Sequence, residues 1–143
     1  MDFLEQITAE WLEYCGYFVR RNVQVGASET GGTACELAVV AFHPETNHLV
    51  QVEPSMEAST RPVRLRRYRL KFEAGRTHIP TMFAALGNAR EIDQVALFGF
   101  GTRSDDTALA GGRVMYVDEL ITEVQNGLRD QPSLGRGVSE RFV

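Results

Sequence analysis

Two apolar runs joined by a short polar turn constrain most strongly what this chain can fold into. Residues 35–42 (CELAVVAF) and 49–54 (LVQVEP) are rich in β-branched and apolar side chains, which is typical of strands. Between them, the segment HPETNH contains a proline and an asparagine, both of which favour a reversing turn. We therefore predict a β-hairpin whose two strands lie about 5 Å apart.

The segments on either side of this hairpin predict helices and further strands. Apolar residues repeat at helical spacing from about residue 3 to 15, and Gly16 is expected to end that helix. A second helix is expected from Pro62 to Gly75, followed by a shorter helix that begins near Pro80. Asp118 is expected to cap a last helix. Its apolar face would consist of Leu120, Ile121, Val124 and Leu128. Additional strands are expected at 17–26, 92–100 and 113–117, the last two separated by a polar loop over 101–112.

The order helix, three strands, helix, two strands, helix predicts an α/β fold with a central mixed five-stranded sheet flanked by helices. The length of 143 residues suits one domain. We assign this domain to residues 1–129 and expect residues 130–143, which contain Pro, Gly and Ser, to form a mobile tail. The chain shows neither signal-peptide features nor 18 consecutive apolar residues, so we expect a cytoplasmic protein without membrane contact.

Acidic side chains on the predicted hairpin are the first candidates for chemistry. Because side chains alternate across a strand, we expect one face of the first strand to carry Glu36, Ala38 and Val40. One face of the second strand should likewise carry Gln51, Glu53 and Ser55. Hydrolysis of a phosphodiester with Mg²⁺ needs hard oxygen ligands, an oriented water and positive charge. Glu36 and Glu53 are therefore candidate ligands of Mg²⁺ or Mn²⁺. The same pair of acids also fits a solvated sheet face.

At this hairpin the sequence resembles the PD-(D/E)XK superfamily, and its element order is most similar to the restriction-endonuclease-like and Holliday junction resolvase-like branches. The resemblance covers residues 3–125. It implies that an aspartate on the second strand and a glutamate on the third bind the metal, and that a lysine two residues after the glutamate positions or activates the water. Here these three positions hold Ala38, Glu53 and Ser55. A methyl group cannot bind a metal, and a neutral hydroxyl cannot supply an ammonium's charge.

Residues 31–59 are also similar to a bacterial subgroup of this superfamily, in which the first motif reads ELD and the second reads EPS followed by an acidic residue. By this resemblance Ser55 is the usual residue and Ala38 is the departure. Two explanations stay open: a natural member that has lost its site, or an engineered form in which Ala38 replaces a metal-binding aspartate. The resemblance implies a restriction-endonuclease-like fold and a nuclease that needs Mg²⁺ or Mn²⁺ and is inactive with Ala38.

A basic segment follows the hairpin directly. Residues 61–76 contain six arginines and the chain's one lysine against a single glutamate, although the whole chain carries a net charge of −4. On a helix Arg64, Arg67 and Lys71 share one stripe, which makes them candidates for contacting the phosphate backbone of DNA. Lys71 could also replace the missing catalytic lysine. The run fits a solvated helix surface as well.

Three functions remain open from the sequence. The first is a metal-dependent endonuclease that acts on DNA and is disabled at position 38. The second is a non-catalytic DNA-binding or regulatory module that retains the fold, and the third is an interaction protein that dimerises. A homodimer also fits the first function, because nucleases that cut both strands are often symmetric. The cysteines and histidines show no ligand spacing, so we assign them no chemistry.

Overall fold

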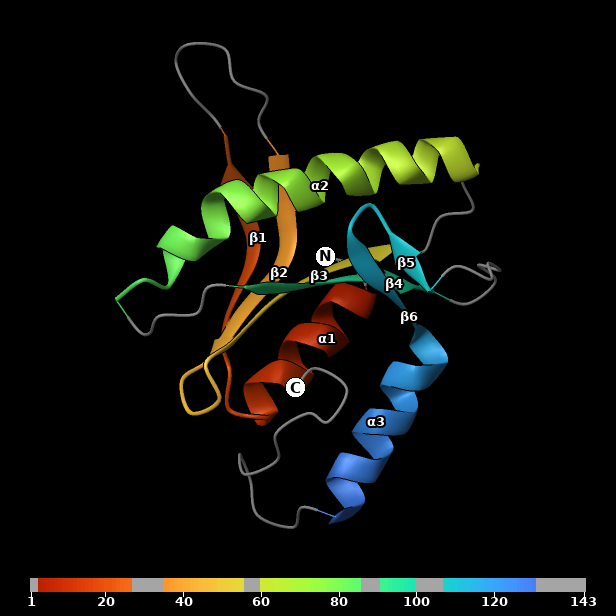
Figure 1. Cartoon of the computed structure of the whole chain (residues 1–143). Coiled ribbons are helices and arrows are strands. Elements are labelled where there is room, and N and C mark those ends of the chain that lie inside the picture. The colour runs from red at the N-terminus through yellow and green to blue at the C-terminus, as the bar shows by residue number, and fades with distance from the viewer. Residues whose placement is uncertain (1–2, 27–34, 56–59, 86–90, 100–106, 131–143) are drawn as a thin grey trace.

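A computed structural model of the chain describes residues 3–26, 35–55, 60–85, 91–99 and 107–130. Within these residues six strands form one mixed sheet and three helices pack against it (Figure 1). In chain order the elements are α1 (Phe3–Tyr14), β1 (Phe18–Val25), β2 (Cys35–His43), β3 (His48–Ser55), α2 (Arg61–Met82), β4 (Ile92–Phe98), β5 (Ala108–Leu109), β6 (Gly112–Tyr116) and α3 (Val117–Asp130). The predicted α/β class and mixed sheet are confirmed, with six strands in place of five.

The sheet has the strand order β1-β2-β3-β4-β6-β5. β2 is antiparallel to both of its neighbours, β1 and β3, whereas β3, β4 and β6 run parallel to one another. The predicted hairpin is confirmed: β2 and β3 pair from Val39–Val52 to His43–His48. Its turn includes Asn47 with a φ of 59°, a conformation that asparagine tolerates better than most residues.

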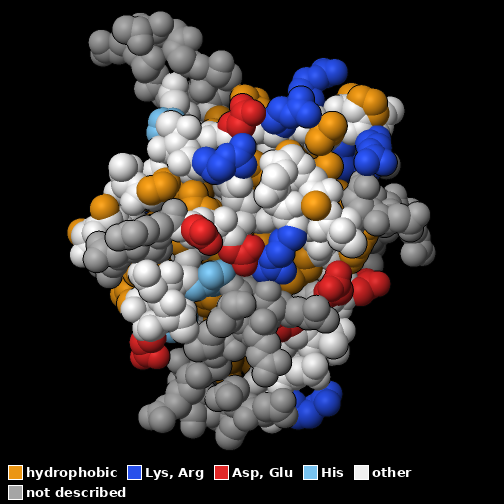
Figure 2. Space-filling model, in the orientation of Figure 1, with side chains coloured by type: hydrophobic (Ala, Val, Ile, Leu, Met, Phe, Trp, Pro, Cys, Tyr) orange, Lys and Arg blue, Asp and Glu red, His pale blue; other side chains and the backbone are white. Residues whose placement is uncertain are grey.

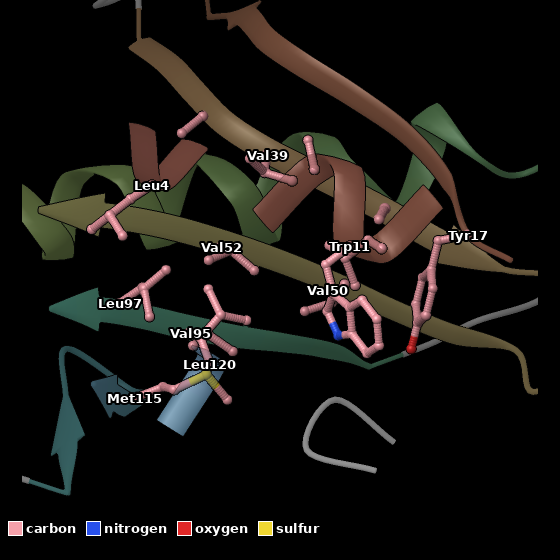
Figure 3. Packing of buried hydrophobic residues seen from close by; sticks show 14 of the residues in the cluster. Leu4, Trp11, Tyr17, Val39, Val50, Val52, Val95, Leu97, Met115 and Leu120 are labelled. Atoms are coloured by element: carbon pink, nitrogen blue, oxygen red, sulfur yellow. The ribbon is translucent and has the colours of Figure 1, made fainter. Parts of the chain in front are cut away.

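The helices cover the two faces of the sheet unequally. In Figure 1, α2 crosses one face alone, while α1 and α3 lie side by side on the other. The larger apolar cluster fills the space under α1 and α3; Figure 3 shows Trp11, Val50, Val95 and Leu120 among its members. Two smaller clusters lie under α2. The inner strands β2, β3 and β4 are therefore buried on both faces, which explains their nearly continuous apolar sequences, whereas the edge strand β1 is largely exposed.

Gly16 ends α1 as predicted. Its φ is 97°, which a residue with a side chain rarely adopts. The amide of Gly16 donates to the carbonyl of Glu13, and the amide of Tyr17 donates to the carbonyl of Leu12. This pair of hydrogen bonds is a Schellman motif, and it turns the chain directly into β1.

The prediction for α2 is wrong in two places. The helix continues through Gly75, where it was expected to end, and Pro80 lies inside its last turns instead of beginning a new helix. Gly75 has a packing role here, because a Cβ at this position would lie 2.0 Å from Oε1 of Gln51. Local sequence signals could not distinguish a glycine that ends a helix from one that lets a strand side chain approach it closely.

β5 lies in the segment that was predicted to be a loop. It forms a hairpin with β6 through Ala110 and Gly111, whose φ angles are 52° and 87°. Positive φ at both central residues is the requirement of a type I′ turn, which matches the twist of paired strands. The short extra strand therefore follows from the conformation of these two residues.

The prediction that Asp118 caps α3 is wrong: the helix begins at Val117, so Asp118 lies inside its first turn. The carboxylate of Glu119 accepts a hydrogen bond from the amide of Tyr116, which satisfies a donor at the helix start. Leu120 is buried as expected, but Leu128 is 54 % exposed. The predicted mobile tail begins at residue 130, which is the last residue of α3; residues 131–143 lie outside the described part of the chain. Among the described helices, none combines the length and apolar character needed to cross a membrane.

Candidate functional site

Glu53 is a buried acid on the face of the sheet that α2 covers. Only 2 % of it is exposed, and its carboxylate accepts hydrogen bonds from the amide of Ala38 (3.2 Å to Oε2) and from Nε2 of Gln51 (3.0 Å). Burial raises the pKa of Glu53, and the Lys71 ammonium and these hydrogen bonds act in the opposite direction. The net result is an acid whose pKa is above its ordinary value.

Lys71 brings a positive charge to this acid from α2. Its Nζ lies 3.4 Å from Oε1 of Glu53 and donates a 2.8 Å hydrogen bond to the backbone carbonyl of Glu36. The Lys71 side chain is 28 % exposed, so it reaches from the surface to the buried carboxylate. Lys71, singled out in the sequence as a replacement for the missing lysine, is thus next to Glu53.

The pairing of β1 with β2 is irregular beside Glu53. Arg21 pairs with Val39 and Val23 pairs with Leu37, so that Asn22 and Ala38 between them are not paired. Asn22 has a φ of 51°, far from the extended values of a regular strand. The amide of Ala38 is directed to the Glu53 carboxylate. Its backbone nitrogen is therefore part of the site.

The expectation that Ala38 shares a face with Val40 is wrong. The Ala38 methyl group belongs to the apolar cluster under α1, together with Val39, whereas Val40 belongs to a cluster under α2. The irregularity at Ala38 interrupts the alternation from which the expectation was drawn. By contrast, the shared face of Gln51 and Glu53 is confirmed by the hydrogen bond between their side chains.

Ser55 is buried near the end of β3. Its hydroxyl is hydrogen-bonded to the hydroxyl of Tyr68, which donates a 2.9 Å hydrogen bond to the backbone carbonyl of Glu53. Burial raises the pKa of Tyr68, so its hydroxyl remains protonated. Ser55 and Tyr68 thus join the end of β3 to α2, and the site lies toward the carboxyl end of β3, where ligands of α/β proteins usually bind.

The oxygen donors that the structure describes around Glu53 do not make a magnesium site. Glu53 is a carboxylate at the site, but Glu36 is exposed and contributes its backbone carbonyl to Lys71. Among the described residues, no group of three or more Asp, Glu, His or Cys side chains could hold a metal ion. Mg²⁺ needs several oxygen ligands in near-octahedral geometry. Ala38 cannot supply the second carboxylate that the resemblance places there.

Basic side chains gather over α2, as the upper part of Figure 2 shows. Within the predicted stripe, Arg67 is exposed and Arg64 is half-buried. The guanidinium of Arg64 lies 5.0 Å from the centre of the Phe98 ring, a distance suited to a cation–π interaction. Arg64 and Lys71 are thus partly directed inward, and Arg67 is the stripe residue with the most solvent contact.

Sequence reasoning missed two polar residues under α2, Gln51 and Gln94. Both are buried, and Nε2 of Gln94 donates a 2.8 Å hydrogen bond to Oε1 of Gln51. The available signal was a glutamine inside each of two otherwise apolar strands. A buried amide must find hydrogen-bond partners, so such positions indicate a polar contact across the sheet.

A second polar cluster was also missed, at the amino ends of the parallel strands. The hydroxyl of Tyr17 lies 2.6 Å from Nδ1 of His48, and Nε2 of His48 lies 3.1 Å from Oδ2 of Asp93. Arg113 donates two hydrogen bonds to Asp93, at 2.8 and 2.9 Å. His43 holds the hairpin turn, because its Nδ1 accepts hydrogen bonds from the backbone amides of Glu45 and Thr46.

Comparison of the chain with known protein families finds no family that matches, and comparison with curated proteins finds no relative. The resemblance at the hairpin therefore rests on the residues of this chain.

Proposed function

We propose that this chain is a nuclease-like domain for DNA phosphodiesters, of the metal-dependent PD-(D/E)XK type, and that Ala38 leaves it inactive in this form. The observation that carries the proposal is the contact between Glu53 and Lys71, a buried acid on the third strand and an ammonium from the following helix. An acid and an ammonium held this close are the two groups that remain of the expected site.

Lys71 takes the place of the lysine that is absent at Ser55. A catalytic lysine is defined by where its ammonium lies, and α2 places Nζ of Lys71 3.4 Å from Oε1 of Glu53. The hydroxyl of Ser55 is hydrogen-bonded to Tyr68, and this contact holds the end of β3 against α2. In an intact site the ammonium would orient a water and stabilise negative charge on the phosphate.

Position 38 adjoins Glu53, since the Ala38 backbone nitrogen is 3.2 Å from Oε2 of the carboxylate. An aspartate here would begin in the apolar cluster under α1. Its Cβ would point to the α1 side of the sheet, whereas Glu53 lies on the α2 side, so the carboxylate reaches the polar site only through a local change in the irregular backbone at position 38. Burying an unpaired carboxylate in the apolar cluster is costly, which favours that change. A Mg²⁺ or Mn²⁺ ion would then be held by Asp at position 38 and Glu53, and it would supply the Lewis acid for hydrolysis.

Substrate contact is proposed along α2. Arg64, Arg67 and Lys71 follow helical spacing along one flank of α2, and Lys71 contacts Glu53. Attraction between these cations and phosphates does not depend on base sequence. A symmetric dimer, which would bring two such sites to the two strands of a duplex, stays a prediction.

A non-catalytic DNA-binding module is the second candidate function. The observation in its favour is that Lys71 already compensates the charge of Glu53, so the site is electrostatically satisfied without a metal. In that case α2 would bind DNA equally well with and without Mg²⁺.

Cleavage by the Ala38→Asp variant separates the two functions. The variant should cut single- or double-stranded DNA in Mg²⁺ or Mn²⁺, and adding Glu53→Gln to it should abolish cutting. The unchanged chain should not cut. DNA binding by both forms, without cleavage by either on any DNA or RNA tested, would favour the non-catalytic module.

A further inference from the structure

A chain of hydrogen bonds runs from the surface of α2 to Glu53. Nη1 of Arg76 donates to Oε1 of Gln94 (2.8 Å), Nε2 of Gln94 donates to Oε1 of Gln51 (2.8 Å), and Nε2 of Gln51 donates to Oε2 of Glu53 (3.0 Å). Gln51 is fully buried and Gln94 nearly so, whereas Arg76 is exposed. The chain therefore links a surface guanidinium to the buried acid.

Every donor of the two amides is used. The second N–H of Gln51 donates to the carbonyl of Lys71, and the second N–H of Gln94 donates to the carbonyl of Phe72. If either amide turned over, donors would face donors and acceptors would face acceptors. A guanidinium is only a donor, and an ionised carboxylate and a backbone carbonyl are only acceptors. Arg76 at one end, Glu53 at the other and the two carbonyls between them together fix the direction of both amides.

We propose that Arg76 is a positioning residue for Glu53, and that it acts through Gln94 and Gln51. The guanidinium fixes the Gln94 amide, which fixes the Gln51 amide, which holds Oε2 of the carboxylate opposite the side that Lys71 contacts. This role rests on the proposed function, since Glu53 is the acid that the proposal places in the site. Partners of a functional carboxylate commonly determine its orientation in this way.

Gly75 is the second observation that supports this arrangement. The Gln51 amide lies where a side chain at position 75 would lie, with its Oε1 2.0 Å and its Cδ 2.7 Å from a Cβ built there. Glycine costs a helix interior about 1 kcal/mol relative to alanine. Glycine is nevertheless present at position 75, where any larger residue would displace Gln51 from its hydrogen bonds.

The test is nuclear magnetic resonance of the full chain with Arg76→Met. Methionine keeps an aliphatic side chain but cannot donate, and Arg76 is exposed, so the variant should fold. Exchange of the Gln94 and Gln51 side-chain amide protons should become about tenfold faster, because the loss of one hydrogen bond of about 1.4 kcal/mol corresponds to that factor. The amide proton signal of Ala38 should shift, because its acceptor is Glu53.

Two further variants serve as controls. Arg69→Met removes an exposed arginine from the same helix and should leave all three signals unchanged. Arg76→Lys retains a cationic donor and should restore most of the protection. Gly75→Ala displaces Gln51 directly and should shift the same signals as Arg76→Met.

Unchanged Gln51 and Ala38 signals in Arg76→Met would overturn the positioning role, whatever the activity of the Ala38→Asp variant. Conversely, if the signals respond but Ala38→Asp neither binds metal nor cleaves DNA, the positioning role stands and the proposed nuclease function fails.

Discussion

Nζ of Lys71 lies 3.4 Å from Oε1 of Glu53, and this contact joins α2 to β3 near the carboxyl end of that strand. The acid is almost completely buried and the amine is partly exposed. Water cannot compensate the charge of Glu53 at this depth, so Lys71 and the surrounding N–H groups do so. The stability of the fold and the chemistry of the site therefore depend on the same pair.

Replacing Lys71 with methionine should destabilise the fold in a pH-dependent way. Burial raises the pKa of Glu53 above its ordinary 4.5, and Lys71 opposes that rise, so its removal raises the pKa further. The contribution of Glu53 to stability is present below pH 4.5 and is lost as pH rises through the folded pKa. We expect Lys71→Met to lose about 1–3 kcal/mol in urea unfolding at pH 8, and much less at pH 4.

Glu53→Gln serves as the control for that measurement. Combined with Lys71→Met, Glu53→Gln removes the uncompensated negative charge. The loss of stability should then be the same at pH 8 and at pH 4. An equal loss of stability at both pH values in the Lys71→Met variant would show that the ion pair is not the cause.

Asp93→Asn should weaken the cluster at the amino ends of β3, β4 and β6. Burial raises the pKa of Asp93, but hydrogen bonds from His48 and Arg113 outweigh it, so the pKa lies below 3.8. A depressed pKa gives stability that is present above the unfolded value and lost as pH falls through the folded one. We expect a loss of about 1.5–3 kcal/mol at pH 7 by urea unfolding.

Below pH 3.8 the difference in the free energy of unfolding between Asp93→Asn and the unchanged chain should become smaller. Asp118→Asn changes an exposed aspartate in the first turn of α3 and should cost less than about 1 kcal/mol at pH 7. A destabilisation by Asp93→Asn that persists at low pH would contradict the assigned ion pair.

Arg67→Gln should weaken DNA binding and should make the affinity less sensitive to salt concentration. Each phosphate contact contributes about 0.9 to the slope of log affinity against log salt concentration. Fluorescence anisotropy with a labelled duplex should therefore give a slope smaller by about 0.9, and a similar loss for every sequence. Arg129→Gln, an exposed arginine on α3, should leave the slope unchanged; equal effects of the two substitutions would argue against α2 as the DNA-binding surface.

The hairpin and Glu53 could be predicted because they follow from local patterns. Two apolar runs around a turn fix the pairing of β2 with β3, and alternation along β3 places Gln51 and Glu53 on one face. Helical spacing placed α1 and the basic stretch of α2. The nearness of Lys71 to Glu53 depends in addition on how α2 packs across the sheet.

The remaining features depend on contacts between residues distant in sequence. The unpaired Asn22 and Ala38 lie on different strands, so the break in alternation is invisible in either strand alone. From the sequence alone, Gly75 indicates the end of a helix; its role beside Gln51 becomes evident only from the packing of α2 on β3. The link from Arg76 to Glu53 likewise needs tertiary packing, because its members come from α2, β4 and β3.

Calorimetric titration of the Ala38→Asp variant with Mn²⁺, beside the unchanged chain, tests the central claim most directly. Two ionised carboxylates held close together repel each other, and a divalent cation between them removes that repulsion, so the variant should bind Mn²⁺ saturably, and Glu53→Gln added to it should abolish the binding. The unchanged chain should give no binding heat. Absence of binding by Ala38→Asp, or equal binding by both forms, would contradict a metal-dependent site at Glu53 and position 38.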